Sequence, residues 1–378
     1  MSRIDDLIAE LAQNGVEFAR LGDVIRIKNG RDYKHLGSGD VPVYGTGGVM
    51  THVDTAAHPG PSILIPRKGS LSKLYYVDRP FWTVDTIFYS EVGERFIPKF
   101  LYFYLLTQRL EELNKAGGVP SLTQGELNEL RVPVPPLEVQ REIVRILDHF
   151  TELEAELEAE LEARRLQYEQ YRTALLPTQT GDDVASSTLG GISLKVSSGG
   201  TPSTGRADFY GGDIPWLRTQ EVDFRDITGT SLTITDLGMK NSSAKWIPEN
   251  CVIVAMYGAT AAKVAINRIP LTTNQACCNL QIDPEIADLR YVFHWVSNEY
   301  SQLRALGEGS QSNINAKKVK DYPILLPPLQ RQREVAAALD KFDALVNDLS
   351  IGLPAELAAR RKQHEYYRDK LLTFEELR

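Results

Sequence analysis

The sequence predicts an α/β (α+β) fold in which two globular domains alternate with two long helices that pair as an antiparallel coiled-coil rod. Two observations support this prediction. The stretch PPLEVQREIVRILDHF returns later as PPLQRQREVAAALDKF, with nine of sixteen positions identical. Each copy follows a segment of well over a hundred residues that is rich in turns and β-prone runs. The chain therefore carries an internal pseudo-two-fold repeat.

The predicted elements follow one another as a short helix, a globule, a helix, a linker, a globule and a helix. The N-terminal stretch MSRIDDLIAELAQ is amphipathic and acidic, as expected of a short surface helix. We place the boundaries at 1–18 for the N-terminal helix, 19–136 and 188–328 for the globules, 137–176 and 329–378 for the long helices, and 177–187 for the linker.

Both long helices carry a single apolar stripe. Each begins after a proline pair, and proline is favoured in the first turn of a helix. Apolar residues then recur mostly at spacings of three, four or seven, which places them on one face. Two matching stripes in one chain most simply pack on each other. The alternative is that each helix packs only on its adjoining globule. The stripe residues expected at the pairing surface are Leu147, Phe150, Leu339 and Phe342.

The second copy of the helix is not continuous. Its later half, ARRKQHEYYRDKLL, matches ARRLQYEQYRTALL of the first copy at nine of fourteen positions. Four extra residues separate the two halves in the second copy, and Gly352 and Pro354 lie in that part. Glycine and proline both weaken a helix interior, so we expect a kink or a short break there.

The two globular segments are also related. They begin alike, with LGDVIRIKNG and LGGISLKVSSGG. Their centres align so that Lys73 matches Lys263 and Thr83 matches Thr273. Each then has a helix-like stretch, a Gly/Ser loop and a short β-prone run into the prolines. The globules differ more than the helices, which indicates a shared fold with different targets.

Composition narrows the function. No apolar run is long enough for a membrane helix, and the N-terminus lacks the features of a signal peptide, so we expect a cytoplasmic protein. The three cysteines and six histidines lack the spacing of metal ligands. The net charge of −8 argues against nucleic acid, but ten acidic and only five basic residues fall in 138–176. A basic face elsewhere is therefore possible.

We find no catalytic motif. The sequence has no phosphate-binding loop, no nucleophile elbow and no zinc-protease helix. It instead has turns that mix glycine with basic and aromatic residues, such as VYGTGG, IPRKGSLSKLYY, DIPWLRTQEV and MYGATAAK. Such turns can bring donors to phosphates and base edges. The alternative is that the aromatic residues belong to the core and the basic residues are solvated surface.

Several phrases of the sequence together resemble one known family. IPRKGSLSK, GGTPSTGRADFYGGDIPWLRTQEV and the twice-repeated PPLxxQRE and ARRxQxExYR are similar to phrases of the specificity (S) subunit of type I restriction–modification systems. The resemblance covers almost the whole chain. It implies two target recognition domains, each reading half of a split, asymmetric target in double-stranded DNA. It further implies that the helices act as spacers and dock two methyltransferase (M) subunits.

The resemblance also implies where chemistry resides. The M subunits hold S-adenosylmethionine and methylate adenine, and motor–nuclease (R) subunits cut unmodified DNA. The resemblance therefore implies no catalytic residue and no cofactor in this chain, and the composition predicts neither a metal site nor membrane contact. The turns supply our candidates for DNA contact, which are Tyr44, Lys68, Lys73, Arg218, Tyr257, Lys263 and Gln275.

The repeated Gln-Arg-Glu at the helix openings supplies the candidates for docking partners. Helix formation does not require these three residues at one place in both copies. Either a shared partner contact or attachment to the adjoining globule explains them equally well. The residues are Gln140, Arg141, Glu142, Gln332, Arg333 and Glu334.

Two other functions remain open. A structural protein could use the rod to assemble a complex without reading DNA, and a band-shift assay with the methyltransferase would distinguish it. A fragment of a fused restriction–modification enzyme is disfavoured, because 378 residues hold no catalytic half.

Overall fold

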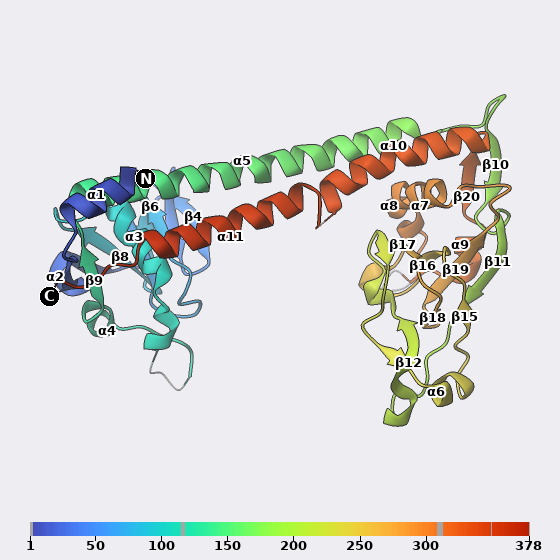
Figure 1. Cartoon of the computed structure of the whole chain (residues 1–378), viewed down its shortest axis with the longest axis horizontal. Helices are drawn as coiled ribbons and strands as arrows, with labels where there is room; N and C mark the ends of the chain where they lie inside the picture. Colours follow the sequence, from blue (N-terminus) through green and yellow to red (C-terminus); the bar gives the residue numbers. More distant parts are fainter. Residues whose placement is uncertain (1–2, 115–117, 308–312, 349, 378) are drawn as a thin grey trace. The chain divides into compact units, whose positions relative to one another are not determined.

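The computed structural model describes residues 3–114, 118–307, 313–348 and 350–377 (Figure 1). It contains two compact units, one of Met1–Glu158 with Glu356–Arg378 and one of Ala159–Ala355. Helix α5, Leu137–Leu175, begins in the first unit and ends in the second. No helix among the described residues is both long and apolar enough to cross a membrane.

The first unit is built on two small sheets and one strand pair. The larger sheet is antiparallel in the order β2-β8-β5-β6, and the smaller has the order β4-β3-β7 with β3 parallel to β7. The elements are α1 Arg3–Leu11, β1 Glu17–Arg20, α2 Leu21–Val24, β2 Ile25–Asn29, β3 Val41–Gly45, β4 Gly48–Val53, β5 Ser62–Pro66, β6 Tyr75–Val77, β7 Trp82–Thr83, β8 Ile87–Val92, α3 Pro98–Thr107, α4 Gln124–Asn128, β9 Arg131–Val134 and α11 Leu353–Leu371. Strands β1 and β9 pair where the chain enters and leaves the globule.

The second unit repeats this plan with additional strands. Its sheets have the orders β11-β19-β16-β17-β13 and β14-β12-β18-β15, and β10 pairs with β20. The elements are β10 Ala185–Thr188, β11 Ser193–Ser198, β12 Tyr210–Leu217, β13 Arg225–Ile227, β14 Thr233–Ile234, α6 Asp236–Lys240, β15 Trp246–Ile247, β16 Val252–Ala255, β17 Val264–Asn267, β18 Leu271–Thr273, β19 Cys277–Ile282, α7 Leu289–Asn298, α8 Tyr300–Ala305, α9 Ala316–Lys320, β20 Pro323–Leu326 and α10 Leu329–Asn347. The predicted fold class, two related globules with long helices, is confirmed.

Corresponding contacts relate the two globules residue by residue. The parallel pair β3–β7 sets Tyr44 against Thr83, and β12–β18 sets Leu217 against Thr273. This matches the sequence alignment of Thr83 with Thr273. In both units an indole N–H donates to a loop carbonyl at 3.0 Å. Trp82 of β7 donates to Arg31, whereas Trp216 donates from β12, the neighbouring strand of the equivalent pair.

Fully buried strands lie at the centre of each globule. All five residues of β5 and all four of β16 are buried, as expected for strands covered on both faces. In the first unit the core continues through α3 into the start of α5, where Ile143 and Leu147 belong to the same cluster as Phe100. The beginning of the long helix is thus part of the globule.

The long helices also contact each other within each unit. In the first unit the Phe150 ring of α5 stacks on His364 and Tyr367 of α11, with centroids 5.6 and 5.5 Å apart. In the second unit Phe342 of α10 stacks on Tyr171 of α5 at 4.9 Å. The contacts run antiparallel. The apolar stripe is therefore shared between the adjoining globule and the opposite helix, which combines the two arrangements left open by the sequence.

The ends of the elements differ in detail from the sequence boundaries. Helix α1 ends at Leu11 because the chain turns into β1 at Glu17. Strand β10 begins at Ala185, within the linker predicted for residues 177–187. The expected break occurs where α10 ends at Asn347 and α11 begins at Leu353. Residues after α11 close the first unit, since Leu372 lies in its core and Glu376 pairs with Arg131 at 2.6 Å.

A buried polar cluster joins α7 to α10 in the second unit. His294 of α7 is fully buried, and its Nε2 lies 2.7 Å from Oδ1 of Asp340 in α10. The Arg290 guanidinium reaches the same carboxylate at 2.5 Å. The corresponding place in the first unit is simpler, with a Lys99–Asp148 pair at 2.8 Å and Phe103 in place of the histidine.

This cluster makes stability sensitive to acid. Burial lowers the pKa of His294, even though the Asp340 carboxylate acts in the opposite direction by stabilising the protonated imidazole. Burial alone would raise the pKa of Asp340, but hydrogen bonds from His294 and Arg290 bring it below its ordinary value. Both groups therefore bind protons less readily in the folded state than in the unfolded chain. The free energy of unfolding should fall as the pH drops below the ordinary histidine pKa of 6.5.

We predict that His294→Phe, which installs the residue type of Phe103, makes the free energy of unfolding fall less as the pH drops. Urea unfolding at about pH 7.5 and about pH 5.5 should show a smaller difference for the variant than for the wild type, because one proton-linked group has been removed. His149→Phe is the control, since His149 is exposed on α5. If wild type and His294→Phe lost the same stability between the two pH values, His294 would not be the source of the acid sensitivity.

Candidate DNA-recognition interface

Two equivalent loops, β5–β6 and β16–β17, carry four of the seven residues predicted to contact DNA. Each loop turns at a glycine with positive φ, +86° at Gly69 and +78° at Gly258, a conformation that favours glycine. Each is held by one matching hydrogen bond of 2.9 Å, from Leu122 N–H to the carbonyl before Lys68 and from Ile314 N–H to the carbonyl before Tyr257. Lys68 and Tyr257 therefore occupy equivalent exposed positions.

In the first unit the predicted residues come together around the β3–β4 turn. Lys73 Nζ lies 3.3 Å from the carbonyl of Gly47 and 5.6 Å from the centre of the Tyr75 ring. The Tyr75 hydroxyl donates to the Thr46 carbonyl at 2.9 Å, and the Tyr44 ring lies 5.8 Å from the Tyr75 ring. The turn and the β5–β6 loop thus form one surface, with Tyr44 half-buried beneath it.

This surface offers cations without carboxylate partners. Lys68 and Lys73 are both exposed, and neither forms an ion pair within the part of the chain that the structure describes. Val49 and Met50, on β4 after the turn, are exposed apolar side chains. Sequence reasoning did not select them, and the glycine-rich VYGTGG stretch before them was the available signal. Cations beside exposed apolar groups suit a surface that contacts both phosphates and bases.

The corresponding surface of the second unit has a different chemistry. Lys263 Nζ lies 2.6 Å from Oδ1 of Asp223, so a carboxylate already neutralises its charge. Tyr257 is 41% exposed and stands where the first unit has Lys68. The two units therefore share a loop geometry and differ in the groups that the loops present.

The remaining predicted residues lie on neighbouring segments of the second unit. Arg218 follows β12, and its Nη2 lies 3.4 Å from the Ser231 hydroxyl, while its Nε is buried without a hydrogen-bond partner. Gln275 is exposed after β18 and contacts the Thr201 hydroxyl. Both residues are already engaged by the chain's own side chains, in contrast to Lys68.

The helix openings divide into buried and exposed residues. Gln140 is completely buried, and its Oε1 accepts from Ile97 N–H at 2.8 Å while its Nε2 donates to the Pro135 carbonyl at 2.8 Å. Gln332 repeats these contacts with Asp288 N–H at 2.9 Å and the Pro327 carbonyl at 2.9 Å. These amides attach each helix to its own globule, which is the alternative to partner docking that the sequence left open.

The neighbouring charged residues differ in their exposure. Glu142 is buried, with Arg145 at 2.7 Å, and the hydrogen bond from Arg145 lowers the pKa of its carboxyl group. Glu142 therefore also serves the fold and is not available to a partner. The exposed members of the set are Arg141, Arg333 and Glu334.

The cysteines show none of the features of reactive thiols. Burial raises the pKa of Cys251 to about 11 and that of Cys278 to about 12, so both remain protonated near neutral pH. Cys277 is also buried, and burial raises the pKa of its thiol. Among the described residues, no group of three or more His, Cys, Asp or Glu side chains is placed to hold a metal ion.

Comparison with known proteins identifies relatives over both repeats. A family model described as the type I restriction modification DNA specificity domain matches residues 13–163 and 181–359. The chain is 35% identical, over 291 residues, to the type I restriction enzyme EcoR124I/EcoR124II specificity subunit of Escherichia coli. That match covers 73% of this chain and 70% of the relative.

Solved structures share the fold. The S subunit of a type I restriction–modification system from M. genitalium superposes with a TM-score of 0.61 at 15% identity, covering 95% of this chain and 96% of that one. A chain from a structure that describes complex assembly and conformational transition of the type I system gives 0.65 at 17% identity, with 95% and 97% coverage. At these identities the likeness concerns the fold alone.

Proposed function

The chain belongs to the specificity subunits of type I restriction–modification systems, and we propose how its parts divide the work of such a subunit. A specificity subunit recognises DNA and is not itself the catalyst. We propose that each globule reads one half of a bipartite target, the first through the loop with Lys68 and Lys73 and the second through the loop with Tyr257 and Lys263. The observation that carries this proposal is the equivalent loop geometry with different side chains.

Unlike loops should read unlike half-sites. Base edges in the major groove are distinguished by patterns of donors and acceptors, so loops with different donors favour different bases. Lys68 and Lys73, which form no ion pair with any described residue, give the first unit a stronger attraction for phosphate than the second, where Lys263 already pairs with Asp223. An asymmetric target follows from this difference.

We further propose that the long helices set the distance between the half-sites. Helix α5 has 39 residues, which corresponds to about 58 Å at about 1.5 Å per residue. One turn of duplex DNA spans about 34 Å. A helix of this length is therefore long enough to leave several base pairs between the half-sites uncontacted.

The proposed partners supply the chemistry. Two methyltransferase subunits, which hold S-adenosylmethionine, would dock beside the two globules, and motor–nuclease subunits would complete a cleaving complex in the cytoplasm. The repeat supports two docking places, because the exposed Arg141 and Arg333 stand at the same position of the two helix openings. A scaffold that does not read DNA is the alternative, and DNA binding distinguishes the two.

We predict that replacing both Lys68 and Lys73 by alanine weakens binding of the assembled complex to duplex DNA. The slope of log affinity against log salt should fall by about two, since each phosphate contact contributes about one. Lys28→Ala is the control, because Lys28 already pairs with Glu91 at 3.6 Å. Fluorescence anisotropy at several salt concentrations measures the slopes. Unchanged affinity and slope in the double variant would exclude these two lysines as phosphate contacts.

We predict that Arg141→Glu with Arg333→Glu weakens methyltransferase assembly without unfolding the chain. Both side chains are exposed, and Arg141 has only a 3.6 Å pair with Glu138 inside the described structure. Light scattering should give a mass for two methyltransferases per wild-type chain and a lower mass for the variant. The control is Arg331→Glu, an exposed arginine on the same turn as Arg333 that pairs with Glu334. A full-mass complex from the double variant would assign these arginines to the fold alone.

A further inference from the structure

The repeated motif ARRxQxExYR is neutralised by carboxylates in the first unit. There it lies on α11 and faces the acidic stretch of α5. Arg361 pairs with Glu158, and His364 Nδ1 lies 2.7 Å from Glu154. Arg368, at the end of the motif, pairs with Asp369 at 2.7 Å. The chain itself thus shows what this motif binds, namely an acidic helix that also supplies the aromatic ring of Phe150.

The same motif in the second unit lacks these carboxylates. It lies on α5, where Arg165 and Arg172 stand at the positions of Arg361 and Arg368. Neither Arg165 nor Arg172 forms an ion pair with a carboxylate within residues 3–114, 118–307, 313–348 and 350–377. The Arg172 Nε is buried and has no hydrogen-bond partner among the described residues, and its guanidinium lies 5.2 Å from the centre of the Tyr168 ring.

The absence of a carboxylate opposite Arg165 follows from where α10 ends, whereas Arg172 is followed by Thr173 in place of the aspartate that follows Arg368. The helix opposite the motif is α10, which offers Val346 at the position equivalent to Glu154 and stops at Asn347. The next turn, which would place a residue at the position of Glu158, is interrupted by the break before α11. Phe342 still stacks on Tyr171 as Phe150 does on Tyr367. Only the last turn of the complementary helix is absent.

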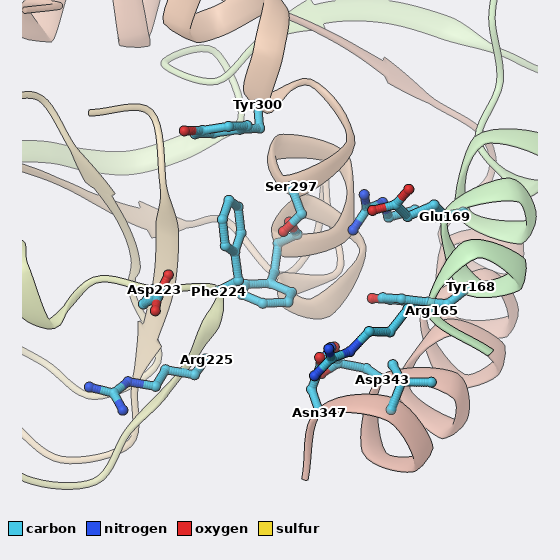
Figure 2. A pocket seen from close by; sticks show the side chains of 13 residues that line it. Arg165, Tyr168, Glu169, Asp223, Phe224, Arg225, Ser297, Tyr300, Asp343 and Asn347 are labelled. Atoms are coloured by element: carbon cyan, nitrogen blue, oxygen red, sulfur yellow. The ribbon is translucent and has the colours of Figure 1, made fainter. Parts of the chain in front are cut away.

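A cavity of about 490 Å³ occupies this place (Figure 2). Arg165, Tyr168 and Glu169 extend into it from α5, and Phe224 and Tyr300 lie on the other side. The rings of Phe224 and Tyr300 meet edge to face at 5.3 Å. Phe224 has φ of 51°, a strained backbone for a bulky residue. Strain of this kind is kept where the surrounding structure requires one exact side-chain position.

The charges around the cavity do not balance. Of its three carboxylates, Asp223 pairs with Lys263 at 2.6 Å and Asp343 lies 3.7 Å from Arg290. Among the described residues that line the cavity, Glu169 is then the one carboxylate left to offset three arginines, which are Arg165, Arg172 and Arg225. The cavity therefore combines aromatic walls with uncompensated positive charge.

We propose that this cavity binds an acidic segment of a partner protein, which contributes carboxylates to Arg165 and Arg172 and an aromatic or aliphatic side chain to the space beside Tyr168. The inference does not depend on the DNA-reading role proposed above. A protein carboxylate is favoured over a DNA phosphate, because in the first unit an acidic helix supplies the carboxylates that pair with Arg361 and His364 of the same motif. The apolar wall formed by Phe293 and Val346 also suits a hydrocarbon side chain.

The test uses the full chain and a labelled synthetic peptide with the sequence of residues 146–160, ILDHFTELEAELEAE. This peptide reproduces the segment that α11 contacts in the first unit. Fluorescence anisotropy should show saturable binding that weakens about tenfold or more for Arg165→Glu with Arg172→Glu, since like charges then face each other. A peptide with glutamine in place of Glu154 and Glu158 should bind correspondingly weakly.

Matched variants distinguish a loss of peptide binding at the cavity from a general effect of charge and from unfolding. Arg164→Glu makes the same kind of change on the same turn, but Arg164 pairs with Glu160 and does not line the cavity, so binding should stay within about twofold of wild type. Arg165→Gln, a milder change at an exposed residue, should give an intermediate loss with an unchanged unfolding midpoint.

Three results would overturn the proposal. The wild-type chain could fail to bind the peptide, or the double reversal could bind it as tightly as wild type. In the third case the double reversal would weaken binding of a labelled DNA duplex and leave peptide binding intact, which would identify the arginines as phosphate contacts.

Discussion

Everything in this structure depends on burying the apolar stripe of each long helix inside a compact unit. In each unit the stripe is shared between a globule and the opposite helix. At the start of each helix a buried glutamine sets the helix on its globule, since Gln140 and Gln332 satisfy both their donor and acceptor groups there. A buried amide is costly when unpaired, and this fixes the helix in one rotational position. Farther along, Phe150 and Phe342 then meet the opposite helix.

A shared scaffold with different surface groups explains how a duplicated chain can recognise two different things. The two globules keep the same parallel strand pair, the same glycine turn and the same supporting hydrogen bond beneath it. The side chains on this scaffold differ. Lys68 of the first unit corresponds to Tyr257 of the second. Lys73 has no carboxylate partner among the described residues, whereas its counterpart Lys263 pairs with Asp223. The same contrast appears on the helices, where identical arginines are neutralised in one unit and not in the other. Duplication preserved the positions, and substitution of their neighbours changed what those positions offer.

Local sequence patterns were sufficient for the helices, the break before α11 and the equivalent loops, because periodicity, proline and glycine act on nearby backbone. Contacts between distant residues were not accessible in this way. The pairing of Lys263 with Asp223 spans 40 residues, and nothing near Lys263 indicates it. The burial of Gln140 departs from the usual exposure of glutamine, so the sequence left a partner contact and attachment to the globule equally open for the whole trio. Likewise, only the three-dimensional structure shows that Trp82 and Trp216 make equivalent hydrogen bonds from different strands of the matching strand pairs.

We propose that one duplicated chain reads two different half-sites held apart by its helices. Mapping methylated adenines across the genome of cells with and without this gene tests it most directly. We expect a motif that depends on the gene and consists of two unlike half-sites separated by several unspecified base pairs. A short, continuous palindrome that depends on the gene would contradict it.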